Sequence, residues 1–245
     1  MVNFKRWLIA QDYERAFWSR VADRIVSGAS KQLSWYGWKA SEMEKRLVDY
    51  FDDGRRKSAK VLEIGSGPVG IISFISYGER YAIDPLETFY RSNAVLTSLR
   101  DPAVGYGQGT GEQLPFKDSF FSLVILDNVL DHVQEATSVL NEIYRVLSIE
   151  GLIYLVINVH TEWGAFLHSG LSKIKIDKGH PHTFTVKSIR EFISRHRFDI
   201  LREEINDYCQ AREKDRRSSS LKDKIKGYSG LSEFIYYGVY SKQSL

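Results

Sequence analysis

The sequence predicts a doubly wound α/β protein with a mostly parallel sheet. Short apolar runs that fit buried strands alternate with amphipathic segments of about 10 to 14 residues. Two of these runs, "SLVILD" and "GLIYLVINV", are continuously apolar, as expected when helices cover both faces of a strand. A glycine-rich turn follows the first run. In this class of fold, ligands bind at such turns, beyond the carboxyl ends of the strands.

Residues 1–56 are expected to form a helical cap in front of a second unit, residues 57–245. Apolar residues recur near helical spacing in residues 4–26 and predict one or two amphipathic helices with these side chains inward: Phe4, Leu8, Tyr13, Phe17, Val21 and Ile25. Ser41 stands three residues before Glu44, a capping-box pattern that predicts a helix start. That helix would carry Met43, Leu47 and Phe51 inward and end near Gly54.

The larger unit begins near Lys60, where the pattern changes to alternating strands and helices. The expected strands are residues 60–64, 80–84, 122–127, 151–159, 198–205 and 233–241, and the expected helices are 69–76, 86–99, 135–147 and 186–196. The last two strands are expected to pair as an antiparallel ending of the sheet. The basic segment 212–226 between them is expected to be a solvated loop, with substrate or partner contact as the alternative.

Composition excludes several classes of protein. The net charge of +3 over 245 residues is too small to indicate a nucleic-acid partner, whose signature would be a concentrated basic face, so none is expected. Cys209 is the only cysteine, which excludes an intrachain disulfide and a multi-cysteine zinc site. The apolar runs are far shorter than the ~20 residues of a membrane-spanning helix. The N-terminal apolar stretch is too short for a signal peptide, so we expect a cytoplasmic protein.

The turn in "VLEIGSGPVG" is the first indication of a ligand. Gly65, Gly67 and Gly70 have the spacing of a dinucleotide-binding turn. Asp84 ends the next strand, where its carboxylate can accept hydrogen bonds from both hydroxyls of an adenosine ribose. These features fit NAD and S-adenosylmethionine (SAM) equally well. Glu63 favours SAM, because a carboxylate repels a pyrophosphate and attracts the cationic methionine end of SAM.

Pro68 also favours SAM over NAD, because it removes an N–H from the turn where a pyrophosphate needs backbone donors. Further motifs follow in order: "YAIDPLETFY", "GTGEQLPFKDSFFSLVILDNVLDHV" and "EIYRVLSIEGLIYLVINV". With the glycine turn they resemble the motifs of class I SAM-dependent methyltransferases, and most closely the small-molecule branch that includes the ubiquinone and menaquinone biosynthesis enzymes. The resemblance covers about residues 60–160, with a weaker likeness at "HTFT", and does not include the N-terminal helices.

The resemblance implies a Rossmann-like sheet of seven strands with an antiparallel last strand. It also implies SAM as cofactor, S-adenosylhomocysteine (SAH) as product and a small-molecule or glycan acceptor. The cofactor-binding residues that it implies are Glu63, Gly65 and Gly67 at the methionine end, Asp84 at the ribose, Pro85, Leu86, Gly111 and Glu112 at the adenine, and Asp127 and Asn128 beneath the cofactor. Thr110 departs from the family, where an Asp often accepts from the adenine amino group. Glu112 could take over that contact.

A general base would assist transfer to a hydroxyl or amine, although a preorganised or acidic nucleophile needs none. Histidine is the usual base near neutral pH, and the candidates are His132, His160 and His182, with His180 in the same loop as His182. These histidines favour O-methylation over N-methylation. A zinc ion on His160, His180 and His182 is the alternative, but we expect no metal.

Trp35, Tyr36 and Trp38 form the most concentrated aromatic group. They either pack the N-terminal helices onto the larger unit or form a substrate-binding wall. Two other functions remain as alternatives. An NAD-dependent oxidoreductase would need a catalytic Tyr-x-x-x-Lys pair, and neither Tyr144 nor Tyr154 has a lysine four residues later. A non-catalytic SAM-binding protein would keep the fold without turnover.

Overall fold

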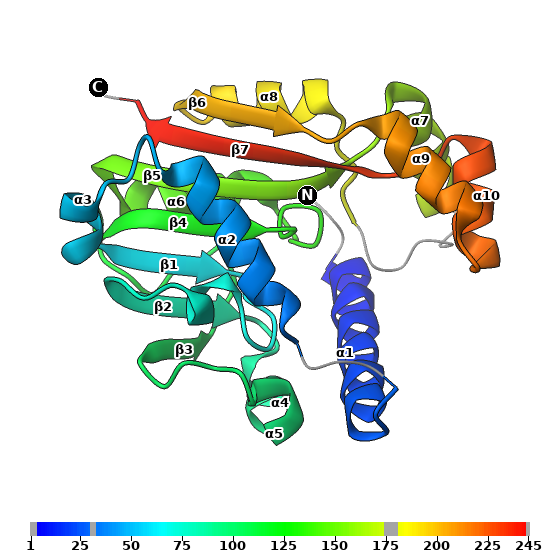
Figure 1. The fold of residues 1–245 in the computed structure, drawn as a ribbon. Helices are drawn as coiled ribbons and strands as arrows, with labels where there is room; N and C mark the ends of the chain where they lie inside the picture. Colours follow the sequence, from blue (N-terminus) through cyan, green and yellow to red (C-terminus); the bar gives the residue numbers. More distant parts are fainter. Residues whose placement is uncertain (1–3, 30–32, 174–180, 244–245) are drawn as a thin grey trace.

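A computed structural model describes residues 4–29, 33–173 and 181–243 (Figure 1). Within them, seven strands form one sheet in the order β3-β2-β1-β4-β5-β7-β6. The strands are β1 Lys60–Ile64, β2 Glu79–Asp84, β3 Val104–Gln108, β4 Phe121–Asp127, β5 Leu147–Val159, β6 Phe198–Ile205 and β7 Phe234–Lys242. Strands β1 to β5 pair in parallel, and β7 runs antiparallel to both β5 and β6. The predicted seven-stranded, mostly parallel sheet with an antiparallel last strand is confirmed.

Helices cover both faces of this sheet (Figure 1). They are α1 Phe4–Val26, α2 Trp35–Leu47, α3 Asp53–Lys57, α4 Glu87–Arg91, α5 Ala94–Thr97, α6 Ala136–Val146, α7 Glu162–Lys173, α8 Val186–Arg195, α9 Tyr208–Arg217 and α10 Leu221–Ser229. Successive strand residues point to opposite faces. Leu62 therefore packs in one core with α6 and α8, and Val61 packs in a second core with α1 and α2. Burial on both faces explains why the central strands are continuously apolar.

Helix α2 begins earlier than the capping-box pattern predicts. Ser41 lies inside the helix, and its hydroxyl donates a hydrogen bond to the Gly37 carbonyl (3.1 Å). A serine in mid-helix commonly makes this bond, so the spacing to Glu44 did not mark a helix start. The inward face was predicted well, because Met43, Leu47 and Phe51 are fully buried.

Helix α1 exposes three of the apolar residues that were predicted to face inward, whereas Val21 and Ile25 are partly buried against the second core as predicted. Leu8, Tyr13 and Phe17 are 42–43% exposed, whereas Ala10 and Trp18 are buried. The sequence pattern was wrong for these three residues because α1 packs on the second core only in part, around Trp18 and Ala22. It lies over a cavity at the carboxyl edge of the sheet, and such a cavity accepts polar side chains as well as apolar ones.

Segment 212–226 is largely helical, which corrects the predicted loop. Helices α9 and α10 form a hairpin between β6 and β7 (Figure 1). The Asp207 carboxylate accepts from the Cys209 N–H at the start of α9, and the Ser220 hydroxyl accepts from the Asp223 N–H at the start of α10. Gly230 ends α10 in the left-handed region (φ 82°). These caps, rather than an apolar stripe facing a core, indicate the helices.

Two other elements depart from the predicted order. Strand β3 was not predicted, because two of its five residues are glycines, Gly105 and Gly107, which weaken a strand pattern. The predicted helix 86–99 is broken into α4 and α5, where the Asn93 side chain caps α5 by accepting from two backbone N–H groups. Both changes lie at the edge of the sheet and leave its carboxyl end intact.

Candidate functional site

A cavity of about 360 Å³ lies at the carboxyl ends of β1, β2 and β4. All ten residues that the sequence assigned to a cofactor line it: Glu63, Gly65, Gly67, Asp84, Pro85, Leu86, Gly111, Glu112, Asp127 and Asn128. They come from four segments of the chain, which the parallel sheet brings to one edge. Helices α1 and α2 supply the opposite wall.

The glycine turn after β1 leaves its backbone close to the cavity. Gly65 and Gly67 have φ values of 66° and 61°, a region that glycine adopts without strain. A Cβ at Gly65 would lie 2.7 Å from Val129 Cγ2, and one at Gly67 would lie 2.8 Å from the Tyr36 hydroxyl. A side chain at either position would therefore crowd the wall of the cavity.

Glu63 is buried beneath this turn and supports it. Its two carboxylate oxygens accept hydrogen bonds from the backbone N–H groups of Ile71 (3.1 Å) and Ile72 (2.9 Å). Burial raises the pKa of Glu63 to about 8, although the two N–H donors act in the opposite direction. Its carboxylate thus holds the backbone that follows the glycine turn, and when ionised it offers a negative charge to a cationic ligand.

Asp84 joins the ends of β1 and β2. One carboxylate oxygen accepts from the Gly67 N–H (2.9 Å) and the other from the Leu86 N–H (2.8 Å). Burial raises the pKa of Asp84 to about 6. A carboxylate has about four acceptor positions, so each oxygen can accept one further hydrogen bond from a ligand in the cavity.

The adenine-side residues are partly engaged by the protein itself. Glu112 Oε1 accepts from the N–H groups of Gln134 (2.8 Å) and Glu135 (3.3 Å), which ties this loop to the start of α6. Thr110 lines the cavity and forms an isolated bridge with Gln113. The contacts of Glu112 show that it braces this loop.

Asp127 and Asn128 end β4 in different ways. Asp127 Oδ2 lies 2.5 Å from Nζ of Lys39, a residue of α2 that the sequence analysis missed. Asn128 has a φ of 60°, and its side-chain oxygen accepts from the Asn158 N–H (3.2 Å). Asparagine tolerates this conformation better than most residues. Asn128 therefore turns the chain while its neighbour Asp127 presents a charge to the cavity.

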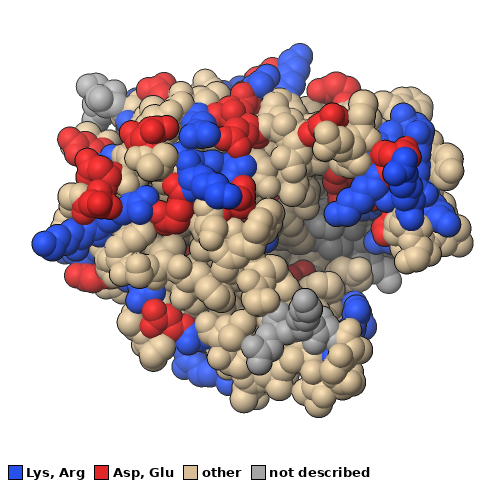
Figure 2. All heavy atoms as spheres, viewed as in Figure 1, with Lys and Arg blue, Asp and Glu red and all other residues tan. Residues whose placement is uncertain are grey.

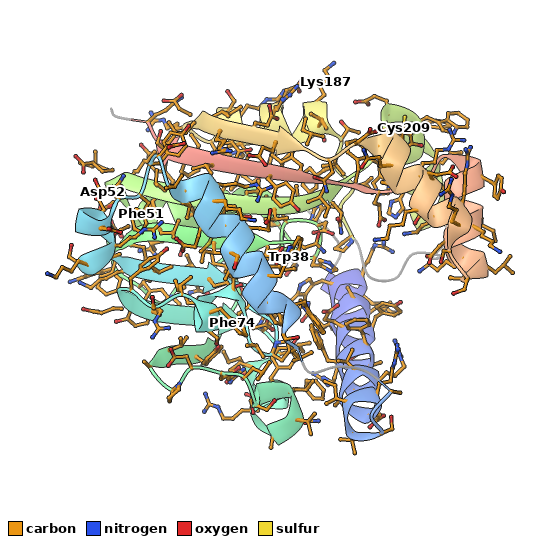
Figure 3. All side chains as sticks on the ribbon, in the orientation of Figure 1. Trp38, Phe51, Asp52, Phe74, Lys187 and Cys209 are labelled. Carbon is orange, nitrogen blue, oxygen red and sulfur yellow. The ribbon has the colours of Figure 1, made fainter. Side chains whose placement is uncertain are left out.

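Aromatic side chains from α1 and α2 form one wall of the cavity. Trp35 stacks on Trp18 (ring centroids 6.4 Å apart) and on Tyr36 (5.6 Å). Tyr36 is buried, and this burial raises its pKa well above the usual value. Trp38 does not join them. It is 58% exposed, lies on α2 as Figure 3 labels it, and borders a separate cavity of about 140 Å³.

Helical geometry explains why the aromatic group divides. Residues that are two positions apart on a helix are rotated by about 200° around its axis, so Tyr36 and Trp38 point to nearly opposite sides. Lys39 follows Trp35 by four residues and shares its face. The same spacing could have identified Lys39 from the sequence. On α1, Gln11, Glu14 and Trp18 also line the cavity at helical spacing, and these too were missed.

Of the three catalytic candidates, the structure places only His132 in the wall of this cavity. His132 Nε2 lies 3.5 Å from Oδ2 of the buried Asp131. A carboxylate beside an imidazole can orient the ring and stabilise its protonated form. His132 lies in the turn between β4 and α6, which starts at Ala136.

The other two candidates lie outside this cavity. His160 stacks on His168 (4.8 Å between ring centroids), and its Nε2 lies 3.7 Å from Glu233. His182 Nε2 lies 3.0 Å from the Val133 carbonyl, which can only accept, so this nitrogen is a donor. Burial lowers the pKa of His182. Neither residue lines the cavity, and these contacts favour structural roles for both.

His180, the third ligand of the alternative zinc site, lies outside the described residues. Among the residues that are described, no group of three or more His, Cys, Asp or Glu side chains is arranged to hold a metal ion. The described helices include none that is both long and apolar enough to span a membrane.

Comparisons with known proteins show the same family likeness along the chain. Residues 62–155 match a family model described as a methyltransferase domain. Norajmaline N-methyltransferase of Rauvolfia serpentina is 26% identical over 106 residues, which are 41% of this chain and 36% of the plant protein. The Bacillus subtilis protein YrhH is 28% identical over 126 residues, which are 49% of this chain and 67% of that protein. The chain thus spans about a third of the length of the plant relative.

The solved structures show likeness of fold. Phosphoethanolamine N-methyltransferase 2 of Haemonchus contortus, in complex with phosphomonomethylethanolamine and SAH, has a TM-score of 0.59 and 13% identity to this chain. The alignment covers 83% of this chain and 53% of the Haemonchus protein. At this identity, the fold is what the two proteins have in common.

Proposed function

We propose that this chain, whose residues 62–155 match a methyltransferase domain, is a class I SAM-dependent methyltransferase that transfers the methyl group of SAM to a small-molecule or glycan acceptor. The observation that carries this proposal is the arrangement of Asp84, Gly67 and His132 around one cavity. A ribose-binding carboxylate, an open glycine turn and a potential base are the three parts that such a reaction uses.

The residues of the cavity fit SAM in charge as well as in position. Five carboxylates line it, and among the described lining residues Lys39 is the single lysine or arginine. The carboxylates are Glu14, Glu63, Asp84, Glu112 and Asp127. This excess of negative charge favours a ligand that carries a sulfonium and an ammonium group. Lys39 is suited to the carboxylate at the methionine end, and Asp84 to the ribose hydroxyls.

SAM supplies a methyl group that is already activated by a positively charged sulfur. The protein has to align the acceptor and exclude water, and positioning of this kind can lower a barrier by ~7–11 kcal/mol. We propose that α1 and the Trp18, Trp35 and Tyr36 wall provide this alignment as the cap of residues 1–56. His132, next to Asp131, would accept the proton that a hydroxyl acceptor loses.

O-methylation is the first candidate reaction, because His132 with its carboxylate partner suits a nucleophile that must be deprotonated. N-methylation is the second. The norajmaline and phosphoethanolamine enzymes are N-methyltransferases by name, and the acidic cavity would also attract an amine. A screen of hydroxyl and amine acceptors, read by SAH release and by product mass, tests both.

The screen also separates catalysis from binding alone. Acceptor-dependent SAH release identifies an enzyme and the acceptor atom. Binding of SAH without release for any acceptor in the screen favours the non-catalytic alternative. Cofactor specificity is tested with NAD in the same thermal-shift assay, where SAH is expected to raise the melting temperature and NAD is not.

A further inference from the structure

The α9–α10 hairpin plays no part in either cavity, yet it has a distinctive surface. Its two helices pack on each other through Gly227, whose carbonyl accepts from Nε of Arg212 (2.8 Å) and of Arg216 (3.2 Å). The hairpin projects at one end of the molecule, away from the central strands (Figure 1). One side of α10 thus packs against α9, and the opposite side is exposed to solvent.

The exposed side of α10 carries large apolar side chains. Leu221, Ile225 and Tyr228 are 74%, 56% and 70% exposed. At about 100° per residue they fall within an arc of about 60° on the helix surface. Lys224 lies on one side of this arc and Lys222 on the other. The result is an apolar stripe with a lysine at each border, which we call the α10 stripe.

Helix α7 extends the apolar surface at the end of α10. Trp163 Nε1 donates to the Ser229 carbonyl (3.3 Å), which holds the indole against the last turn of α10. Phe166 stacks on Trp163 with ring centroids 6.0 Å apart and is 72% exposed. Trp and Tyr side chains are typical of the boundary between lipid headgroups and acyl chains, because one end is apolar and the other polar.

Positive charge is concentrated in the same hairpin. Residues 208–229 hold seven Lys or Arg against three Asp or Glu, a net charge of +4, whereas the whole chain has +3. Figure 2 shows lysines and arginines gathered over α9 and α10. Lys226 pairs with Glu233 (3.2 Å). Within the described chain, Lys222 and Lys224 have no carboxylate at ion-pairing distance, so their charges are available to a partner.

We propose that the α10 stripe, with Trp163 and Phe166, binds the surface of a membrane that contains anionic lipids. An amphipathic helix with apolar side chains on one face and lysines beside them lies in the plane of such an interface. A membrane suits this surface better than an acidic protein, because the apolar side chains stand on a projecting hairpin. A lipid layer needs no complementary shape, and a protein partner would.

Vesicle sedimentation with the full-length protein tests this proposal. We expect binding to vesicles that contain phosphatidylglycerol and little binding to vesicles of phosphatidylcholine alone. Each lysine near an anionic surface contributes about 1 kcal/mol, so Lys224→Gln should lower the partition coefficient about fivefold. Ile225→Ser should lower it by a similar or larger factor, because an inserted side chain is lost.

Matched controls lie elsewhere on the surface. Lys187→Gln removes an exposed lysine on α8, outside the hairpin (Figure 3), and Ile149→Ser removes an apolar side chain that is 71% exposed. Both should leave vesicle binding unchanged, and all four variants should keep the wild-type melting temperature. Equal effects of the hairpin and control variants would overturn the proposal. Absence of vesicle binding would also overturn it. So would binding of the protein to polyglutamate, if polyglutamate also displaces the protein from vesicles.

Discussion

Lys39 Nζ and Asp127 Oδ2 lie 2.5 Å apart in the wall of the cavity, although 88 residues separate them in the chain. The pair connects α2 of the predicted cap to the end of β4. The Asp127 side chain is 7% exposed and that of Lys39 is 33% exposed, so a ligand entering the cavity meets both charges in a partly dehydrated setting. A zwitterionic methionine end can exchange partners with this pair, carboxylate to Lys39 and ammonium to Asp127.

Lys39→Met should therefore weaken SAH binding. Loss of a hydrogen bond to a charged group costs about 1.5–3 kcal/mol, which corresponds to roughly ten- to hundredfold in Kd. Calorimetric titration measures the change. The control is Lys45→Met on the same helix, where the side chain is 70% exposed and pairs with Glu42. An unchanged Kd for the Lys39 variant would show that the pair is structural only.

His132→Asn should lower kcat for a hydroxyl acceptor by about 10²–10⁴-fold, the usual contribution of a general base. SAH affinity should stay close to that of the wild type, because the cofactor contacts are made by other residues. Asp131→Asn should reduce kcat in the same direction by a smaller factor. His196→Asn, at the end of α8, is the control. An unchanged kcat in the His132 variant would show that the methyl group reaches the acceptor without this base.

Stability of the ligand-free protein should fall as the pH rises. Burial raises the pKa of Glu63 from 4.5 to about 8 and that of Asp84 from 3.8 to about 6, so the folded protein binds these protons more tightly than the unfolded chain. The stabilisation is complete below the unfolded pKa values and is lost as pH rises through about 6 and then about 8. Differential scanning calorimetry across this window measures it.

Glu63→Gln should flatten the upper part of this profile, between about pH 6 and 8, because the variant has no proton to lose there. SAH should bind more tightly at the higher pH, since its ammonium group favours the ionised carboxylates. The lower part of the profile should remain, because it belongs to Asp84. A profile in the Glu63 variant that matches the wild type would contradict this assignment.

Trp18→Ala should loosen α1 from the rest of the protein. Trp18 is 7% exposed, and the variant loses its stacking on Trp35 and its edge contact with Tyr90 (6.1 Å). Limited proteolysis should cut within α1 more readily, and kcat/KM for the acceptor should fall more than SAH affinity does. Trp38→Ala is the matched control, since Trp38 lies outside this cavity. Equal protease resistance in both variants would argue against a closing role for α1.

The parallel sheet and its carboxyl-edge residues were predictable because strand patterns and ordered motifs are local. A strand ends within each of the motifs "VLEIGSGPVG", "YAID" and "LDN". Parallel neighbouring strands place their carboxyl ends at the same edge of the sheet, regardless of the length of the connections between them. The face of α1 was not predictable in this way. Its apolar period suggested burial of Leu8 and Tyr13, yet the helix lies over a cavity and buries Ala10 and Trp18.

Long-range pairs account for most of what the sequence missed. Lys39 is paired with Asp127, 88 residues away, and only the folded structure shows that His132 lines the cavity and His160 does not. The hairpin of α9 and α10 was read as a loop because its helices expose apolar residues and bury almost none, so no core-facing period is visible. Its caps at Asp207 and Ser220 are the local signal that was present.

Calorimetric titration of the full-length protein with SAH tests the central claim most directly. We expect saturable binding of one SAH per chain, and a Kd that Asp84→Ala weakens by about 1.5–3 kcal/mol, because the ribose loses a charged acceptor. Asp53→Ala, an exposed carboxylate on α3, should leave the Kd unchanged. Failure of the wild-type protein to bind SAH, with the fold intact by its melting transition, would contradict the assignment of this cavity to SAM.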